Sequence, residues 1–171
     1  EGLFESLNGK KGCGDTDENV DENRTRAIRA LSPGALNAEE GIAHIVHEFN
    51  TKVLFAESSG TYKGYDASVT DNDDVVLSQT TADCGTVIIA SSSGAVVALV
   101  HASWHTLSAK IICDVVAKVK SLSNSEELIA GIGPMICGKC YEFGAEAKQL
   151  FDSRYLTPHS DKFLVNLKQM I

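Results

Sequence analysis

The chain has 171 residues, of which 43% are hydrophobic and 22% charged, the balance of a globular protein with a substantial core. Its formal net charge of −8 disfavours a nucleic-acid-binding protein, because an acidic surface repels the phosphate backbone. No apolar run reaches the roughly 20 residues that span a bilayer, and the odd number of cysteines, five, argues against a disulfide framework. We therefore expect a cytoplasmic protein in a reducing compartment, with neither membrane nor nucleic acid as a partner.

The first half of the chain predicts one helix and a series of strands. Residues 16–31 predict a helix, because Asp or Thr can cap it, acids fill its first turns and arginines come late. Three short strands are predicted next, at residues 51–57, 65–70 and 74–80. Two apolar strands, at residues 85–90 and 95–101, flank the turn sequence "SSSG" and are expected to form an antiparallel hairpin.

The second half predicts a long helix, a strand and a short helix. Apolar residues at helical spacing predict a helix over residues 106–122, with Thr106 as its N-cap and Cys113 as a small core residue. Residues 127–134 predict a buried strand, and residues 144–153 a short helix. Because the strands come in clusters between helices, the pattern indicates a mixed, layered α+β fold.

Cysteine and histidine coincide with the predicted strand ends at three places. These places hold His44 and His47, then Asp83 and Cys84, then His101 and His105. If the hairpin pairs as expected, Cys84 and His101 meet at the same edge of the sheet. One thiolate and two neutral imidazoles suit zinc or copper, and three protein ligands leave one position open for water or substrate. The pattern alone does not choose between His44 and His47.

A C-x-x-C motif, Cys137 to Cys140, also stands out. Such a spacing is typical of zinc or redox sites, but no second C-x-x-C accompanies it. The sequence alone therefore favours neither role.

The order of motifs resembles one family over nearly the whole chain. The motifs are "SLNG", "GDTDENVDENR", "IVHEFNTKV", "YDASVT", "TADC", "VVALVHASWHTL" and "AGIGPMICGKCYEFGAEA". Together they resemble the laccase-domain family, also called YfiH-like, or purine nucleoside phosphorylases of the multicopper polyphenol oxidase type. The resemblance implies an α+β fold, a mixed layered α/β/β/α sandwich. It also implies that residues 1–171 form a single domain that lacks the family's N-terminal start and C-terminal end.

The resemblance also implies a site. It assigns His47, Cys84 and His101 as the metal ligands, and so selects His47 over His44. The implied metal is zinc, with copper in older descriptions, and the implied substrates are a purine nucleoside and phosphate. The implied reactions are phosphorolysis of purine nucleosides and deamination of adenosine. Asn8 and His105 are the candidates for substrate contact.

The sequence departs from the family around these ligands. Where the family has "HAGWRG", this chain has "HASWHT", so His105 stands in place of an arginine. A histidine is neither permanently charged nor a bidentate phosphate ligand. Glu48 replaces the glycine after His47, and a carboxylate there would repel phosphate.

Three functions are therefore compared. The first is a zinc-dependent purine nucleoside phosphorylase or adenosine deaminase. The second is a cysteine hydrolase in which Cys84 is the nucleophile and His101 the base, with no metal. The third is a non-catalytic relative that binds a metal or a partner, which the lost arginine favours.

Overall fold

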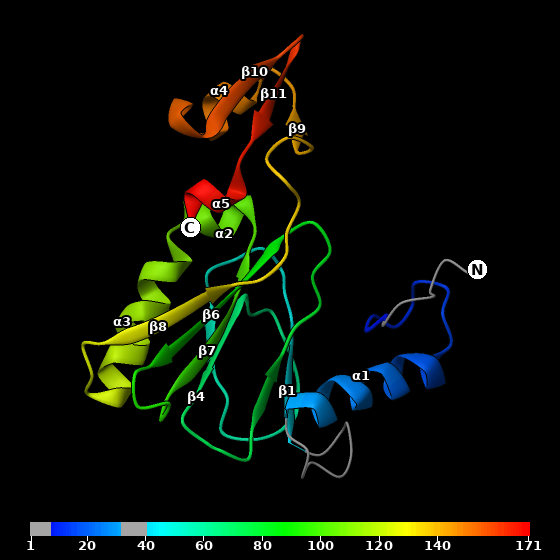
Figure 1. The fold of residues 1–171 in the computed structure, drawn as a ribbon, viewed down its shortest axis with the longest axis vertical. Coiled ribbons are helices and arrows are strands. Elements are labelled where there is room, and N and C mark those ends of the chain that lie inside the picture. Colours follow the sequence, from blue (N-terminus) through cyan, green and yellow to red (C-terminus); the bar gives the residue numbers. More distant parts are fainter. Residues whose placement is uncertain (1–7, 32–40) are drawn as a thin grey trace.

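The computed structural model describes residues 8–31 and 41–171. Two β-sheets lie together between helices (Figure 1). The smaller sheet is parallel and has the order β3 (Gly60–Lys63), β1 (Ile42–Val46), β5 (Val76–Ser78). The larger sheet is mixed and has the order β2 (Val53–Phe55), β4 (Ala67–Thr70), β7 (Val97–Ala102), β6 (Gly85–Ser91), β8 (Leu128–Ile132).

One helix covers the outer face of the larger sheet, and the end of another meets the smaller sheet. Helix α3 (Ile111–Ser123) packs on β4, β6 and β7 of the larger sheet. Helix α1 (Asp17–Leu31) meets the smaller sheet, where its buried Ile28 shares a crevice with Ile42 and Leu77. The arrangement confirms the predicted mixed, layered α+β fold.

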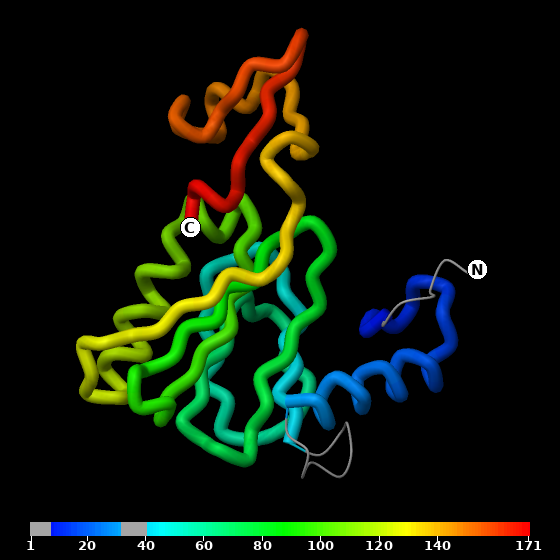
Figure 2. The backbone as a smooth tube through the Cα atoms, in the orientation of Figure 1, coloured from blue at the N-terminus to red at the C-terminus, as the bar shows by residue number. Residues whose placement is uncertain are grey.

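A third, small sheet lies at one end of the molecule. It has the order β10 (Leu156–His159), β11 (Lys162–Val165), β9 (Glu142–Phe143), and α4 (Ala147–Leu150) packs near it. Figure 2 shows this unit extending beyond the larger sheet. Helix η1 (Ser153–Tyr155) precedes β10, and α5 (Leu167–Met170), which follows β11, brings the chain back to α2 (Trp104–Ser108). No helix among the described residues is both long and apolar enough to cross a membrane.

The main core lies between α3 and the larger sheet. It contains the aliphatic face of α3, in which Ile111, Val115 and Val119 recur every four residues and are fully buried. A smaller core lies between the two sheets, around Ala43 and Ile45 of β1. Burying each such side chain contributes about 1.5–3 kcal/mol, so these two cores hold the layers together.

The helix predicted over residues 106–122 is two helices, and Thr106 is not its N-cap. Helix α2 begins after Ser103, whose hydroxyl accepts a hydrogen bond from the Thr106 amide while the Thr106 hydroxyl accepts one from the Ser103 amide. This reciprocal cap starts the helix three residues earlier than the apolar pattern does. Lys110, in the left-handed conformation with φ 62°, then separates α2 from α3.

Two predicted burials are also wrong. Strand β8 is an edge strand, with Ile129 64% exposed, so an apolar sequence did not imply a buried strand there. Cys113 is exposed because it lies away from the helix face formed by Ile111 and Val115. The helix at residues 16–31 and the hairpin of β6 and β7 are confirmed.

Two isoleucines test where the core lies. Replacing Ile111 by alanine removes a fully buried side chain, and we expect the free energy of unfolding to fall by about 2–5 kcal/mol. The matched control, Ile129→Ala on β8, removes a mostly exposed side chain and should lower it by no more than about 1 kcal/mol. Urea unfolding followed by circular dichroism measures both values, and equal losses would contradict this core assignment.

Candidate functional site

The register of β7 places His101 directly between two neighbouring strands. Ala67 of β4 pairs with Val100, so Asp66 lies opposite His101, whose amide donates to the Asp66 carbonyl at 2.8 Å. On the other side Thr86 of β6 pairs with His101. Residues paired across a sheet share one of its faces. Asp66 and Thr86 therefore flank His101 on the face turned toward the smaller sheet.

The smaller sheet supplies the second histidine. Side chains alternate along a strand, and Ala43 and Ile45 of β1 point into the core between the sheets. His47 continues this alternation just beyond the strand and stacks on His101, with ring centroids 3.7 Å apart and an interplanar angle of 18°. His44 belongs to the other face, where its Nδ1 hydrogen-bonds with Ser78 of β5 at 3.1 Å. Strand alternation thus separates the two histidines that the sequence pattern left equivalent.

A buried carboxylate orients His101. The His101 Nδ1–H donates to Asp66 Oδ1 at 2.7 Å, and both side chains are almost fully buried. The other carboxylate oxygen, Oδ2, accepts from the amides of Glu48 and Asn50 at 3.2 and 2.8 Å. Because Asp66 holds Nδ1–H, the lone pair of His101 Nε2 is available to a ligand or a proton.

His47 is held by its other nitrogen. Its Nε2–H donates to the Thr80 carbonyl at 2.7 Å, which leaves Nδ1 as the unprotonated nitrogen. Both imidazoles are thus fixed by acceptors, and each presents one lone pair. Fixing a ring through a hydrogen bond to its far nitrogen is how proteins prepare histidines to bind metals.

The ligand atoms of His47, Asp66 and His101 lie within 4.8 Å of one another, close enough to share a metal ion. Among residues 8–31 and 41–171 no group that includes Cys84 meets this distance. Cys84 lies two residues before Thr86, on the flank of His101 opposite Asp66, and is half-buried. The structure therefore brings the two predicted histidines together, with Asp66 rather than Cys84 as their close neighbour.

Burial sets the protonation of these groups. It lowers the pKa of His101, which His47 lowers further, although the hydrogen bond to Asp66 raises it. The imidazole is therefore neutral at pH 7, as a metal ligand or general base requires. Burial, with the charges of Asp83 and Asp66, raises the pKa of the Cys84 thiol. A cation bound beside that sulfur would reverse this preference and favour the thiolate.

An exposed aromatic ring lies over the histidine pair. Phe49, in the left-handed conformation with φ 57°, packs edge-on against His101 and His105 with ring centroids 5.3 and 5.5 Å apart. His105 in turn stacks on Trp104 at 3.6 Å. His105 therefore lies at the rim of the site and is joined to the two stacked imidazoles through Phe49.

A cleft of ≈ 460 Å³ opens beside His47. Basic side chains gather on its walls: Lys10, Lys11, Arg24 and His44. The charge of Arg24, after burial, lowers the pKa of His44. This basic cleft contrasts with the net charge of −8 of the whole chain and is suited to bind an anion.

Asn8 supports the turn that carries Lys10 and Lys11 at the edge of the cleft. It is not among the residues that line the cleft, and its side-chain amide donates to the Lys10 carbonyl and to Asp15 at 3.2 and 3.0 Å. Asn23 donates to the Asn8 carbonyl at 3.1 Å, which fastens the Lys10–Lys11 turn to α1. In this structure Asn8 supports the basic residues and does not itself face the cleft.

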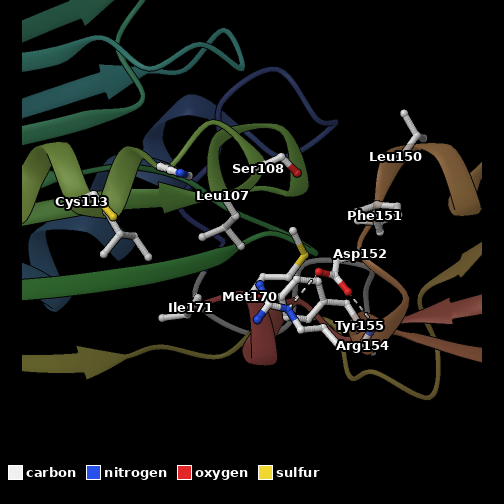
Figure 3. A pocket seen from close by; sticks show the side chains of 12 residues that line it. Leu107, Ser108, Cys113, Leu150, Phe151, Asp152, Arg154, Tyr155, Met170 and Ile171 are labelled. Atoms are coloured by element: carbon white, nitrogen blue, oxygen red, sulfur yellow. Dashed lines mark hydrogen bonds and ion pairs between the residues drawn. The ribbon is translucent and has the colours of Figure 1, made fainter.

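A second cavity, of ≈ 390 Å³, lies where α2 and α3 meet α5 and the segment after α4 (Figure 3). Its walls include Leu107, Phe151, Tyr155 and Met170, with Asp152 and Arg154 at one side. None of the predicted site residues lines it. It is therefore separate from the histidine pair.

Sequence reasoning missed Asp66, Phe49 and the basic cleft. Asp66 lies second in a predicted strand and directly precedes the observed β4, as Cys84 precedes β6, and an acid at the start of a strand was a usable signal. Phe49 and the cleft carried no such signal, because both depend on where the smaller sheet and α1 pack.

Comparisons with known proteins agree on one family. The purine nucleoside phosphorylase YfiH of Escherichia coli (strain K12) is 31% identical over 173 residues, which cover 98% of this chain and 69% of that protein. An adenosine deaminase, RL5, from an unknown prokaryotic organism is 31% identical over 96 residues, covering 56% of this chain and 37% of that protein.

Solved structures share the fold. The Neisseria meningitidis protein NMB0706 superposes with a TM-score of 0.81 at 27% identity, over 99% of this chain and 70% of that protein. YlmD from Geobacillus stearothermophilus superposes with the same TM-score at 22% identity, over 99% of this chain and 69% of YlmD. The family model described as multi-copper polyphenol oxidoreductase laccase matches residues 1–171. The chain therefore belongs to the multi-copper polyphenol oxidoreductase laccase family, whose YfiH-type members it resembles in sequence and fold.

Proposed function

We propose that this protein is a zinc-dependent purine nucleoside phosphorylase. The observation that carries the proposal is the stacked pair of His47 and His101, held by Thr80 and Asp66, in a chain that resembles named purine nucleoside phosphorylases. The basic cleft beside this pair supports phosphate as the second substrate.

The donor set fits a borderline-soft metal. His47, Cys84 and His101 would hold the ion, and Asp66 would orient His101 from behind. Asp66 is better suited to orientation than to ligation, because its two oxygens already accept three hydrogen bonds. Two imidazoles and a thiolate are typical zinc ligands, and they leave a fourth position open. When bound, the metal would supply Lewis-acid polarisation of a substrate oxygen.

The basic cleft would bind phosphate. Arg24, Lys11 and His44 line this cleft. His47 also lines it, so the cleft adjoins the pair of His47 and His101. Arg24 donates from Nε to the Gly9 carbonyl at 2.9 Å, which fixes the side chain. Its two terminal guanidinium nitrogens would then donate to the phosphate. Arg24 would offset the arginine that His105 replaces, because it supplies positive charge from α1, whereas Lys11 is paired with Asp21 at 2.8 Å.

Phe49 would bind the purine. Its side chain is 52% exposed and rises from a backbone held in the left-handed region, beside both His101 and His105. A purine stacked on this ring would place its ribose between the histidines and the cleft. Base stacking on an aromatic side chain contributes about 1–3 kcal/mol.

The reaction exchanges one bond for another. A phosphate oxygen bonds to the C1′ atom of the ribose, the C1′–N9 bond breaks, and N9 takes up the proton that the phosphate gives up as the base leaves. The products are ribose 1-phosphate and the free purine. The protein's part is to hold phosphate and ribose in line and to stabilise the charge on the leaving base.

Adenosine deamination is the second candidate, favoured by the similarity to the RL5 deaminase. Water would then replace phosphate as the attacking group, and the 6-amino group would leave as ammonia. The metal-free cysteine hydrolase is less favoured, because burial and two neighbouring carboxylates hold the Cys84 thiol in its protonated, weakly nucleophilic form.

Metal content and activity together test the proposal. Purified zinc-loaded protein should convert inosine and phosphate to ribose 1-phosphate and hypoxanthine, and chromatography detects the released base. Elemental analysis should find one zinc per chain. Cys84→Ala should lose both the zinc and the activity. Cys113→Ala, at an exposed cysteine of α3, should keep both. A fully active Cys84→Ala would exclude the thiolate ligand, and a wild-type protein that releases no base from any purine nucleoside would exclude the function.

The phosphate role of the cleft has its own test. Removing the charge in Arg24→Gln should raise the KM for phosphate at least about tenfold, while the KM for inosine changes little, because only the anion contacts this wall. Arg29→Gln, later on α1 and outside the cleft, is the control and should leave both constants near their wild-type values. An equal rise in the KM for phosphate in both variants would mean that Arg24 contributes only long-range charge and does not contact the phosphate.

The orienting role of Asp66 predicts a coupled loss. In Asp66→Asn one oxygen becomes an amide nitrogen, so the two backbone amides and His101 Nδ1–H can no longer all donate to this side chain. We expect the free energy of unfolding to fall by about 1–3 kcal/mol and the affinity for zinc by about 10–100-fold. Nitrogen NMR of the imidazoles should also show the His101 tautomer change. The exposed Asp73→Asn is the control, and unchanged zinc affinity in Asp66→Asn would refute the role.

A further inference from the structure

Two cysteines outside the histidine site lie almost in bonding contact. Cys137 and Cys140 lie in the segment between β8 and β9, both are exposed, and their sulfur atoms are 2.9 Å apart. The Cys140 amide donates to the Cys137 carbonyl at 2.9 Å, so a closed backbone turn holds the pair. A disulfide bond is about 2.05 Å long, and closing it needs a movement of only about 1 Å.

The two thiols are not equivalent. A hydrogen bond joins the two sulfur atoms, and the amides of Lys139 and Cys140 and the Lys139 ammonium also favour the Cys137 thiolate. These contacts lower the pKa of Cys137, and the hydrogen bond with Cys137 raises the pKa of Cys140. A pair with one activated thiol and one protonated neighbour has the asymmetry of an attacking and a resolving cysteine.

The backbone before the pair is fixed, and the turn between the two cysteines is closely packed. The Gly133 amide donates to the Thr86 carbonyl at 2.8 Å, and the Ile136 amide donates to the Asp83 carbonyl at 2.9 Å. Gly138 lies against Asn166, where a Cβ atom would come within 2.9 Å of the Asn166 Cγ. The turn can therefore change its sulfur chemistry without moving its anchors.

A metal does not explain the pair. Within the described residues no third histidine, cysteine or carboxylate joins Cys137 and Cys140 at ligand distance. Two exposed thiols without a third donor are better suited to two-electron exchange than to holding an ion.

We propose that Cys137 and Cys140 form a reversible dithiol–disulfide site that exchanges with small disulfides of the glutathione type. The Cys137 thiolate attacks one sulfur of the small disulfide, whose S–S bond breaks and releases one thiolate. Cys140, losing its proton, attacks the Cys137 sulfur of the mixed disulfide and releases the second thiolate. The two cysteine protons pass to the two departing thiolates. The protein dithiol is oxidised by two electrons, and one small disulfide is reduced to two thiols.

The test uses the intact chain and oxidised glutathione, followed by acid quenching and peptide mass spectrometry. The wild type should form an internal bond between Cys137 and Cys140, without retained glutathione, and excess reduced glutathione should reverse it. In Cys140→Ser the resolving thiol is gone, so glutathione should accumulate on Cys137 several-fold more than on Cys113, the exposed cysteine of α3. Cys113→Ser should form the internal bond as the wild type does.

Two results would overturn the proposal. One is a wild type that keeps both thiols free, or carries glutathione on them without an internal bond, under conditions that modify Cys113. The other is a Cys140→Ser variant that traps no more glutathione on Cys137 than on Cys113. Neither measurement uses catalysis, so the proposal stands or falls independently of the proposed phosphorylase activity.

Discussion

The hydrogen bond between Asp66 and His101 is the interaction on which the site depends, and the register of β7 creates it. An antiparallel pairing of β4 with β7 puts the carboxylate opposite the imidazole, and both are buried there. Removing one partner of a buried hydrogen bond typically costs about 1–3 kcal/mol, because the other is left without its bond. The same register sets Thr86, and through it Cys84, on the opposite flank of the histidine. A slip of one residue would turn His101 toward α3 and abolish the site.

The second dependence is on packing between layers. His47 reaches His101 only because the parallel sheet lies on the larger sheet, and the basic cleft exists only because α1 lies on the parallel sheet. The site is thus assembled from three layers, and a basic cleft lies next to the histidines although the net charge of the chain is −8.

The sequence predicted the local parts well and the non-local parts poorly. The β6–β7 hairpin and the α1 helix follow from short-range patterns, and they are confirmed. Neither the early start of α2 nor the break at Lys110 followed, because a capping pair at Ser103 and Thr106 and a left-handed residue at Lys110 override the apolar stripe. The exposure of β8 depends on which strand is last in the sheet, and Asp66 as the neighbour of His101 depends on which strands pair. Neither is encoded within a window of ten residues. The resemblance to the family pointed to His47, Cys84 and His101 as metal ligands. The two histidines do lie together in the structure, and the ligand role of all three stays a prediction.

The terminal methyl group of Met135 lies where a side chain on Gly85 would begin, with only 2.6 Å between its Cε atom and the position of a Cβ atom. Met135, in the loop after β8, thus packs against Gly85, the residue that follows Cys84. The Ile136 amide donates to the carbonyl of Asp83, the residue that precedes Cys84. The backbone on both sides of Cys84 is consequently held by a part of the chain some fifty positions away. Replacing Met135 by a larger or a smaller side chain therefore offers a way to shift Cys84 without altering any group that would meet the substrate.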